Sequence, residues 1–158
     1  MIRGLHHNAY RCRDSEETRR FYEDFLGLPL AHVLEIGETK TGRKARVLHS
    51  FFRLGDGSFL AFFEAPEQPF EFKRQQDFDL HIALEVDPAE LAPTMEKARQ
   101  AGIEVRGISD HGFIDSIYLR DPNGYVIELT AKRPGHDAAM DAAGAARRRL
   151  DAWQAAKH

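Results

Sequence analysis

Two histidines and two glutamates recur at matching places in the two halves of the 158-residue sequence. His7 and His81 each stand near the start of a half, and Glu64 and Glu128 each close its last apolar stretch. Imidazole nitrogens and carboxylate oxygens are common ligands of divalent metals, and either group is costly to bury without a partner. The pattern indicates one divalent metal ion bound by His7, His81 and Glu128. Glu64 is a candidate fourth ligand.

Strands and helices are needed to bring these residues together. Hydrophobic periodicity gives the order βαβββ, a linker, and βαβββ again, so the chain is an internal repeat. We therefore expect an α+β fold with two tandem modules and an appended C-terminal helix. The expected boundaries are module one at 1–65, the linker at 66–77, module two at 78–132, both modules within one domain at 1–132, and a helical extension at 133–158.

Alternation along each strand decides which side chains share a face. In module two, the apolar positions predict that His81, Tyr118 and Glu128 lie on the face turned away from the helix. The same reasoning in module one places Phe62 and Glu64 on the corresponding face, and the repeat places His7 there. Four potential ligands on one type of face are best explained by a cation.

Composition excludes several other kinds of function. The net charge of −3 gives no electrostatic case for binding nucleic acid or an anionic membrane. The apolar fraction is 42%, and no apolar run is long enough to span a bilayer or to serve as a signal peptide. Cys12 is the single cysteine, which excludes an internal disulfide and fits a reducing cytoplasm. We expect a cytoplasmic protein with a small-molecule substrate.

Four segments resemble the vicinal oxygen chelate superfamily, which includes glyoxalase I, extradiol ring-cleaving dioxygenases, methylmalonyl-CoA epimerase and the fosfomycin and bleomycin resistance proteins. The segments lie at 5–9, 21–28, 81–87 and 118–129, and the last, with Asp-Pro-Asn-Gly followed by Ile-Glu-Leu, is the most specific. The resemblance covers about residues 4–131. It implies paired βαβββ modules whose strands curl around a metal cavity. There the metal would chelate two neighbouring substrate oxygens and stabilise the charge that develops on them.

Similarity to extradiol dioxygenases implies that His7, His81 and Glu128 would hold Fe(II) or Mn(II). It also implies catalytic roles for Tyr118, ten residues before Glu128, and for the nearby His111. On this basis a dioxygenase-like activity is the favoured interpretation.

Two features depart from the dioxygenase pattern. The acid/base histidine of those enzymes would fall near Ser58 or Phe59, and neither is histidine. Many such enzymes also contain four modules, whereas this chain contains two.

Two other classes remain open. Glyoxalase- and epimerase-like members carry a fourth ligand on the fourth strand, where Glu64 could serve as ligand and base with Zn(II), Ni(II) or Co(II). A non-catalytic resistance-type binding protein is the third class, and the metal triad counts against it because such proteins usually lack one.

The remaining expectations concern substrate and assembly. Phe62, Ser116 and Arg120 are expected to line the substrate cavity, where Arg120 could bind a carboxylate. His49 is either a pocket acid/base or an exposed strand residue, and the second interpretation is favoured. Small two-module members often dimerise, so we expect a homodimer, with the C-terminal helix covering a neighbouring surface.

Overall fold

The computed structural model describes residues 1–38 and 40–157. Residue 158, at the end of the expected extension, lies outside this range. The described chain divides into two compact units, each with one four-stranded sheet. Unit 1 contains residues 1–80 and 120–125, and unit 2 contains residues 81–119 and 126–157. The α+β class and the repeated module order are confirmed.

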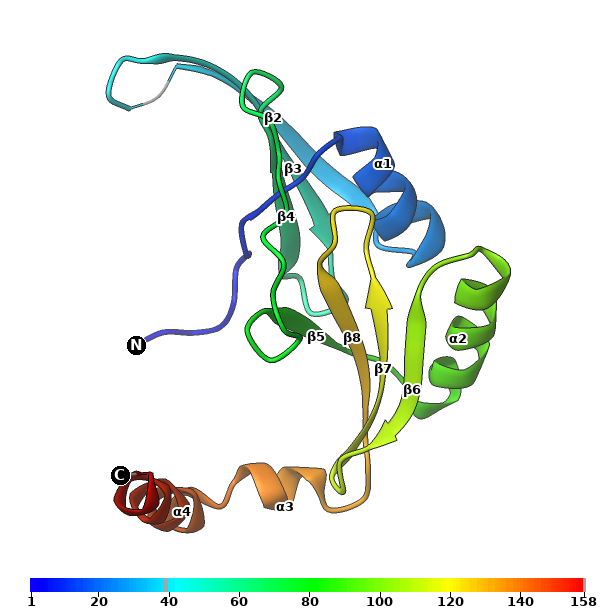
Figure 1. The fold of residues 1–158 in the computed structure, drawn as a ribbon, viewed down its shortest axis with the longest axis vertical. Coiled ribbons are helices and arrows are strands. Elements are labelled where there is room, and N and C mark those ends of the chain that lie inside the picture. The colour runs from blue at the N-terminus through cyan, green and yellow to red at the C-terminus, as the bar shows by residue number, and fades with distance from the viewer. Residues whose placement is uncertain (39, 158) are drawn as a thin grey trace. The chain divides into compact units, whose positions relative to one another are not determined.

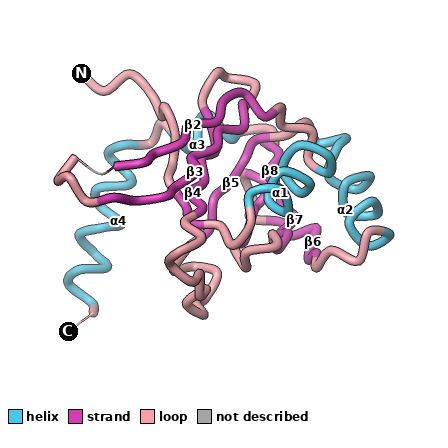
Figure 2. Tube along the Cα trace, turned by 90° about the horizontal axis from the view of Figure 1, so that it is seen from above, coloured by secondary structure: helices cyan, strands magenta, loops and turns pink. Residues whose placement is uncertain are grey.

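Unit 1 contains the first module, whose sheet has the strand order β1-β4-β3-β2. Its elements are β1 (Tyr10–Arg11), α1 (Ser15–Arg19), the π-helical η1 (Arg20–Phe25), β2 (Leu30–Glu38), β3 (Lys44–Arg53) and β4 (Phe59–Glu64). Helices α1 and η1 lie on one side of this sheet (Figure 1). Strands β2 and β3 run side by side as a long antiparallel hairpin (Figure 2).

The helix of unit 1 begins and ends where local sequence predicts. Asp14 is the N-cap, and its Oδ1 accepts a hydrogen bond from the Glu17 N–H at 2.7 Å. At the other end, Gly27 takes a φ of +78°, a left-handed conformation that costs glycine little. The N-terminal segment pairs with β4 through Tyr10–Arg11 and through an isolated bridge between His7 and Phe59.

Unit 2 repeats the arrangement with the strand order β5-β8-β7-β6. Its elements are β5 (His81–Glu85), the 3₁₀ turn η2 (Pro88–Glu90), α2 (Leu91–Gln100), β6 (Val105–Asp110), β7 (Ile114–Arg120) and β8 (Val126–Lys132). Strand β7 ends at Arg120, which clusters with unit 1. Ile117 and Ile127 are fully buried, and Leu91 and Ala98 are the buried residues of α2.

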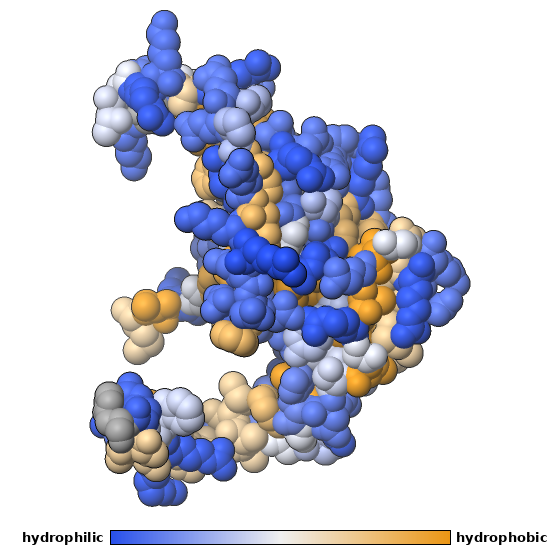
Figure 3. All heavy atoms as spheres, viewed as in Figure 1, coloured by the Kyte–Doolittle hydropathy of each residue, from blue (hydrophilic) through white to orange (hydrophobic). Residues whose placement is uncertain are grey.

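The C-terminal extension forms two helices rather than the single one expected. These are α3 (His136–Met140) and α4 (Ala143–Ala156). Ala142 adopts non-helical angles two residues before Gly144, a poor helix former. Figure 3 shows hydrophobic and hydrophilic side chains mixed along this segment, and Leu150 and Trp153 are exposed. No helix among the described residues is long and apolar enough to cross a membrane.

A buried polar network joins the Asp-Pro-Asn-Gly turn to the helix of unit 1. Tyr22 donates a hydrogen bond to Asp121 Oδ2 at 2.8 Å, and both residues are buried. Asn123 donates to Thr18 Oγ1, and Tyr125 donates to the Arg11 carbonyl. Burial raises the pKa of Asp121, although the hydrogen bonds from Tyr22 and Asn123 oppose that shift. The turn is therefore part of the core of unit 1.

Candidate metal and substrate site

His81 and Glu128 meet on adjacent strands of unit 2. Strands β5 and β8 are parallel, with His81 opposite Val126 and Ala83 opposite Glu128. The His81 Nε2 atom lies 3.1 Å from Glu128 Oε2. Glu128 is only 5% exposed, so its carboxylate needs partners that compensate for lost water. An imidazole nitrogen and a buried carboxylate side by side are a donor set that fits a divalent metal.

Tyr118 and His111 extend this pair into a hydrogen-bonded chain. The Tyr118 hydroxyl on β7 donates to Glu128 Oε1 at 3.3 Å, and His111 Nε2 lies 2.8 Å from the same hydroxyl. Burial, followed by the negative charge of Glu128, raises the pKa of Tyr118. The phenol therefore keeps its proton at neutral pH. The predicted facing of β7 and β8 is confirmed here, because Tyr118 and Glu128 share a face.

Ser116 and Arg120 have protein partners of their own. Ser116 is fully buried and its hydroxyl donates to Thr130 Oγ1 at 3.0 Å. Arg120 Nη1 donates to the Gly124 carbonyl at 2.8 Å, and its Nη2 lies 3.7 Å from Asp77. Substrate contact by either side chain stays a prediction.

His7 lies in unit 1, on the face of the sheet opposite α1. Its ring is 5.5 Å from that of Phe51 and 5.9 Å from that of His49, measured between centroids. This is the face that the repeat predicts for His7. Within either unit, the described residues contain no group of three His, Cys, Asp or Glu side chains arranged around one ion. Joint binding by His7, His81 and Glu128 therefore stays a prediction.

The facing of β4 is opposite to the sequence-based expectation. Phe62 is 1% exposed and packs against Tyr22 of η1, with ring centroids 4.7 Å apart. Phe63 instead stacks on His49, on the other face. Residues 59–63 are all apolar, so alternation alone cannot select a face for this strand. Phe62 is part of the core under the helix, and its expected place in the substrate cavity is wrong.

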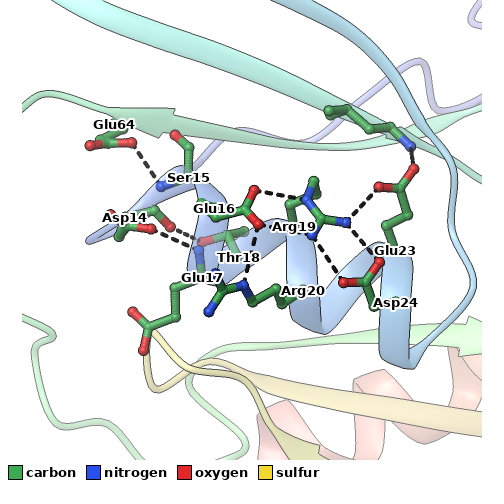
Figure 4. Close-up of polar contacts among 11 residues, drawn as sticks. Asp14, Ser15, Glu16, Glu17, Thr18, Arg19, Arg20, Glu23, Asp24 and Glu64 are labelled. Atoms are coloured by element: carbon green, nitrogen blue, oxygen red, sulfur yellow. Dashed lines mark hydrogen bonds and ion pairs between the residues drawn. The ribbon is translucent and has the colours of Figure 1, made fainter.

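Glu64 shares the helix side of β4 with Phe62. Its Oε2 accepts a hydrogen bond from the Ser15 N–H at 2.7 Å, at the N-terminus of α1 (Figure 4). A carboxylate is favourable there because the first N–H groups of a helix lack intrahelical partners. The prediction that Glu64 faces the cavity with His7 is wrong.

The register of the sheets identifies the residue that corresponds to Glu128 in unit 1. His81 pairs with Val126, and Glu128 follows two residues later. His7 pairs with Phe59, and Ala61 follows two residues later. Ala61 therefore occupies the position in unit 1 that Glu128 holds in unit 2. An alanine side chain offers no ligand atom to a metal.

His49 is buried on the face of the sheet that also bears His7, which the sequence did not indicate. It is 6% exposed, and its ring stacks on that of Phe63 with centroids 3.7 Å apart and an interplanar angle of 8°. Its Nδ1 lies 3.0 Å from the Phe62 carbonyl oxygen. Burial is the main cause that lowers the pKa of His49. The interpretation of His49 as an exposed residue is wrong. In the sequence, its position two residues before Phe51 on the same strand already indicated that the two rings share a face.

A family model described as the Glyoxalase/Bleomycin resistance protein/Dioxygenase superfamily matches residues 4–129. A lactoylglutathione lyase of Neisseria meningitidis serogroup A is 31% identical over 144 residues, which span 85% of this chain and 94% of the lyase.

Solved structures share the fold. A glyoxylase/bleomycin resistance protein/dioxygenase domain from Frankia aligns with a TM-score of 0.67 and 18% identity, over 86% of this chain and 96% of that domain. The fosfomycin resistance protein FosX of Listeria monocytogenes, solved with Mn(II) and sulfate, aligns with a TM-score of 0.62 and 21% identity. That alignment covers 87% of this chain and 99% of FosX.

Proposed function

Because the chain belongs to the glyoxalase/bleomycin resistance protein/dioxygenase superfamily, we propose that it is a metal-dependent enzyme acting on a small substrate with two neighbouring oxygens. The reaction we favour is dioxygenase-like cleavage of a catechol ring. This preference rests on one observation, the chain of polar contacts in unit 2 that links His81, Glu128, Tyr118 and His111.

The ligands we propose are His7, His81 and Glu128, holding Fe(II) or Mn(II). Two imidazoles and one carboxylate leave coordination positions open, as in non-haem iron oxygenases. When bound, the ion supplies Lewis acidity toward the two oxygens of the substrate. The 3.1 Å approach of His81 to the buried Glu128 supports this donor set.

Tyr118 would donate a hydrogen bond to the substrate, and His111 would orient the Tyr118 hydroxyl. The Tyr118 hydroxyl stays protonated at neutral pH and can donate a hydrogen bond to a substrate oxygen in place of Glu128. His111 Nε2 can in turn donate to the same hydroxyl, which fixes its orientation. A donor already aimed at developing negative charge costs little reorganisation during the reaction.

The placement of Glu64 and Ala61 favours a three-residue site over a four-residue one. Glu64 caps α1 on the helix side of its sheet, and Ala61 stands where a carboxylate would repeat Glu128. In a glyoxalase-like mechanism, the metal-bound base that takes a proton from carbon would therefore have to be a residue other than Glu64.

Anaerobic reconstitution with Fe(II) tests the proposal. We expect the loaded protein to consume oxygen with at least one member of a catechol panel and to form a coloured ring-fission product. His81→Ala should lose stoichiometric metal binding, whereas His136→Ala, which replaces a histidine paired with the neighbouring Asp137, should keep it. Tyr118→Phe should keep the metal and lose turnover by about 10²-fold, a typical contribution of one positioned proton donor. Absence of oxygen uptake with every catechol would refute the reaction.

A glyoxalase-type lyase is the second candidate, and the 31% identity to lactoylglutathione lyase favours it. The loaded protein, prepared with Ni(II) or Zn(II), would then convert the hemithioacetal of methylglyoxal and glutathione. Product formation that survives Glu64→Gln would establish lyase chemistry without Glu64 as the base.

A further inference from the structure

His49 stands in the middle of a row of aromatic rings on β3 and β4. Its imidazole stacks face to face on Phe63, with centroids 3.7 Å apart, and lies 4.1 Å from the ring of Phe51 on its own strand. His49 and Phe63 are directly opposite each other in the antiparallel register. Two flanking rings and 6% exposure hold the imidazole in one orientation.

The hydrogen bond of His49 determines what the ring can offer a ligand. A carbonyl oxygen only accepts, so the 3.0 Å contact with the Phe62 carbonyl requires a proton on Nδ1. In the neutral ring with its proton on Nδ1, Nε2 carries a lone pair and is a hydrogen-bond acceptor.

The surroundings of His49 suit a flat and largely apolar ligand. His7 lies on the same face, with its ring 5.9 Å from that of His49. The neighbouring positions on this face are Phe51, Phe63 and the small Ala61, whereas the carboxylate of Glu64 is on the opposite face. An acceptor atom thus lies beside a proposed metal ligand in an aromatic setting.

We propose that His49 is a substrate-recognition residue whose Nε2 accepts a hydrogen bond from a hydroxyl group on a planar aromatic substrate. This inference rests on the proposed function, because it takes His7 as a metal ligand that brings the substrate hydroxyls close. It gives unit 1 a residue for substrate recognition. A flexible peptide-like thiol conjugate would gain little from such a rigid aromatic row.

Binding of catechol to the Mn(II)-loaded protein under argon tests this role without turnover. His49→Phe keeps a ring for stacking and removes the acceptor, so catechol affinity should fall about tenfold, the equivalent of one hydrogen bond of about 1.4 kcal/mol. His49→Gln restores an acceptor and should recover affinity to within about threefold of the natural protein. His136→Phe, which changes a histidine of α3 that is paired with the neighbouring Asp137, is the control and should bind catechol normally.

Titration calorimetry gives the affinities, and metal analysis is run on every variant. Unchanged catechol affinity in His49→Phe overturns this inference and leaves the proposed function standing. Loss of metal from His49→Phe also overturns it, because His49 would then bind the ion itself. If the natural protein holds Mn(II) but does not bind catechol, both proposals fall. If His49→Phe weakens binding but no oxygen is consumed, only the proposed reaction falls.

Discussion

The hydrogen bond from Tyr22 to Asp121 offers a sharp test of the buried network in unit 1. Tyr22 is fully buried, Asp121 is 4% exposed, and their oxygens are 2.8 Å apart. Water cannot replace the phenol in Tyr22→Phe without a rearrangement of the core. A hydrogen bond to a charged group contributes about 1.5–3 kcal/mol, and one between neutral groups about 0.5–1.5 kcal/mol. We expect the free energy of unfolding to fall by the larger amount at neutral pH.

The loss should depend on pH in a defined direction. Burial raises the folded-state pKa of Asp121 above its unfolded value, so its contribution to stability is fully present below about pH 4 and is lost as pH rises through the folded pKa. The Tyr22 hydrogen bond favours the charged carboxylate and limits that shift. Its removal raises the pKa of Asp121 further. The destabilisation by Tyr22→Phe should therefore grow as pH rises from 4 to 8.

Urea denaturation across that pH range measures the effect, and at neutral pH the midpoint should drop by about 1 M for a typical urea slope. Tyr125→Phe is the matched control, because its hydroxyl donates to the neutral Arg11 carbonyl at 2.8 Å. It should cost about 0.5–1.5 kcal/mol with little pH trend. Equal and pH-independent losses in the two variants would refute a charged Asp121 as the acceptor.

Three further predictions concern the helix cap, a close backbone approach and assembly. Glu64→Ala should lower the free energy of unfolding by about 0.5–2 kcal/mol, because the Ser15 N–H loses its acceptor. The metal stoichiometry of this variant should stay unchanged, and loss of metal would contradict the placement of Glu64. Gly124→Ala should lower the melting temperature, because its Cβ would meet the Phe72 ring at 2.9 Å and φ is +104°; an unchanged melting temperature would count against this packing. The natural chain should be a homodimer by light scattering, and deletion of 137–158 should shift it toward monomer if the extension contributes to the interface.

The sequence by itself determined the module order and the site face of unit 2. Periodicity, Asp14 and Gly27 located the first helix, and the turn residues separated the strands. In β8 the charged Glu128 stands between the apolar Ile127 and Leu129, so its face could be inferred together with that of Tyr118. These features are local, and their physical causes act within a few residues.

Only the tertiary structure decided the face of β4 and the partners of its residues. Five successive apolar residues at 59–63 pack equally well either way up, so the choice depends on how β1 pairs with β4. That pairing assigns Phe62 to the core, Glu64 to the helix cap and Ala61 to the position that matches Glu128. The antiparallel register of β3 and β4 also sets Phe63 against His49, which buries the His49 ring in a stack on the site face. Long-range strand register, which a linear pattern does not encode, is the physical reason.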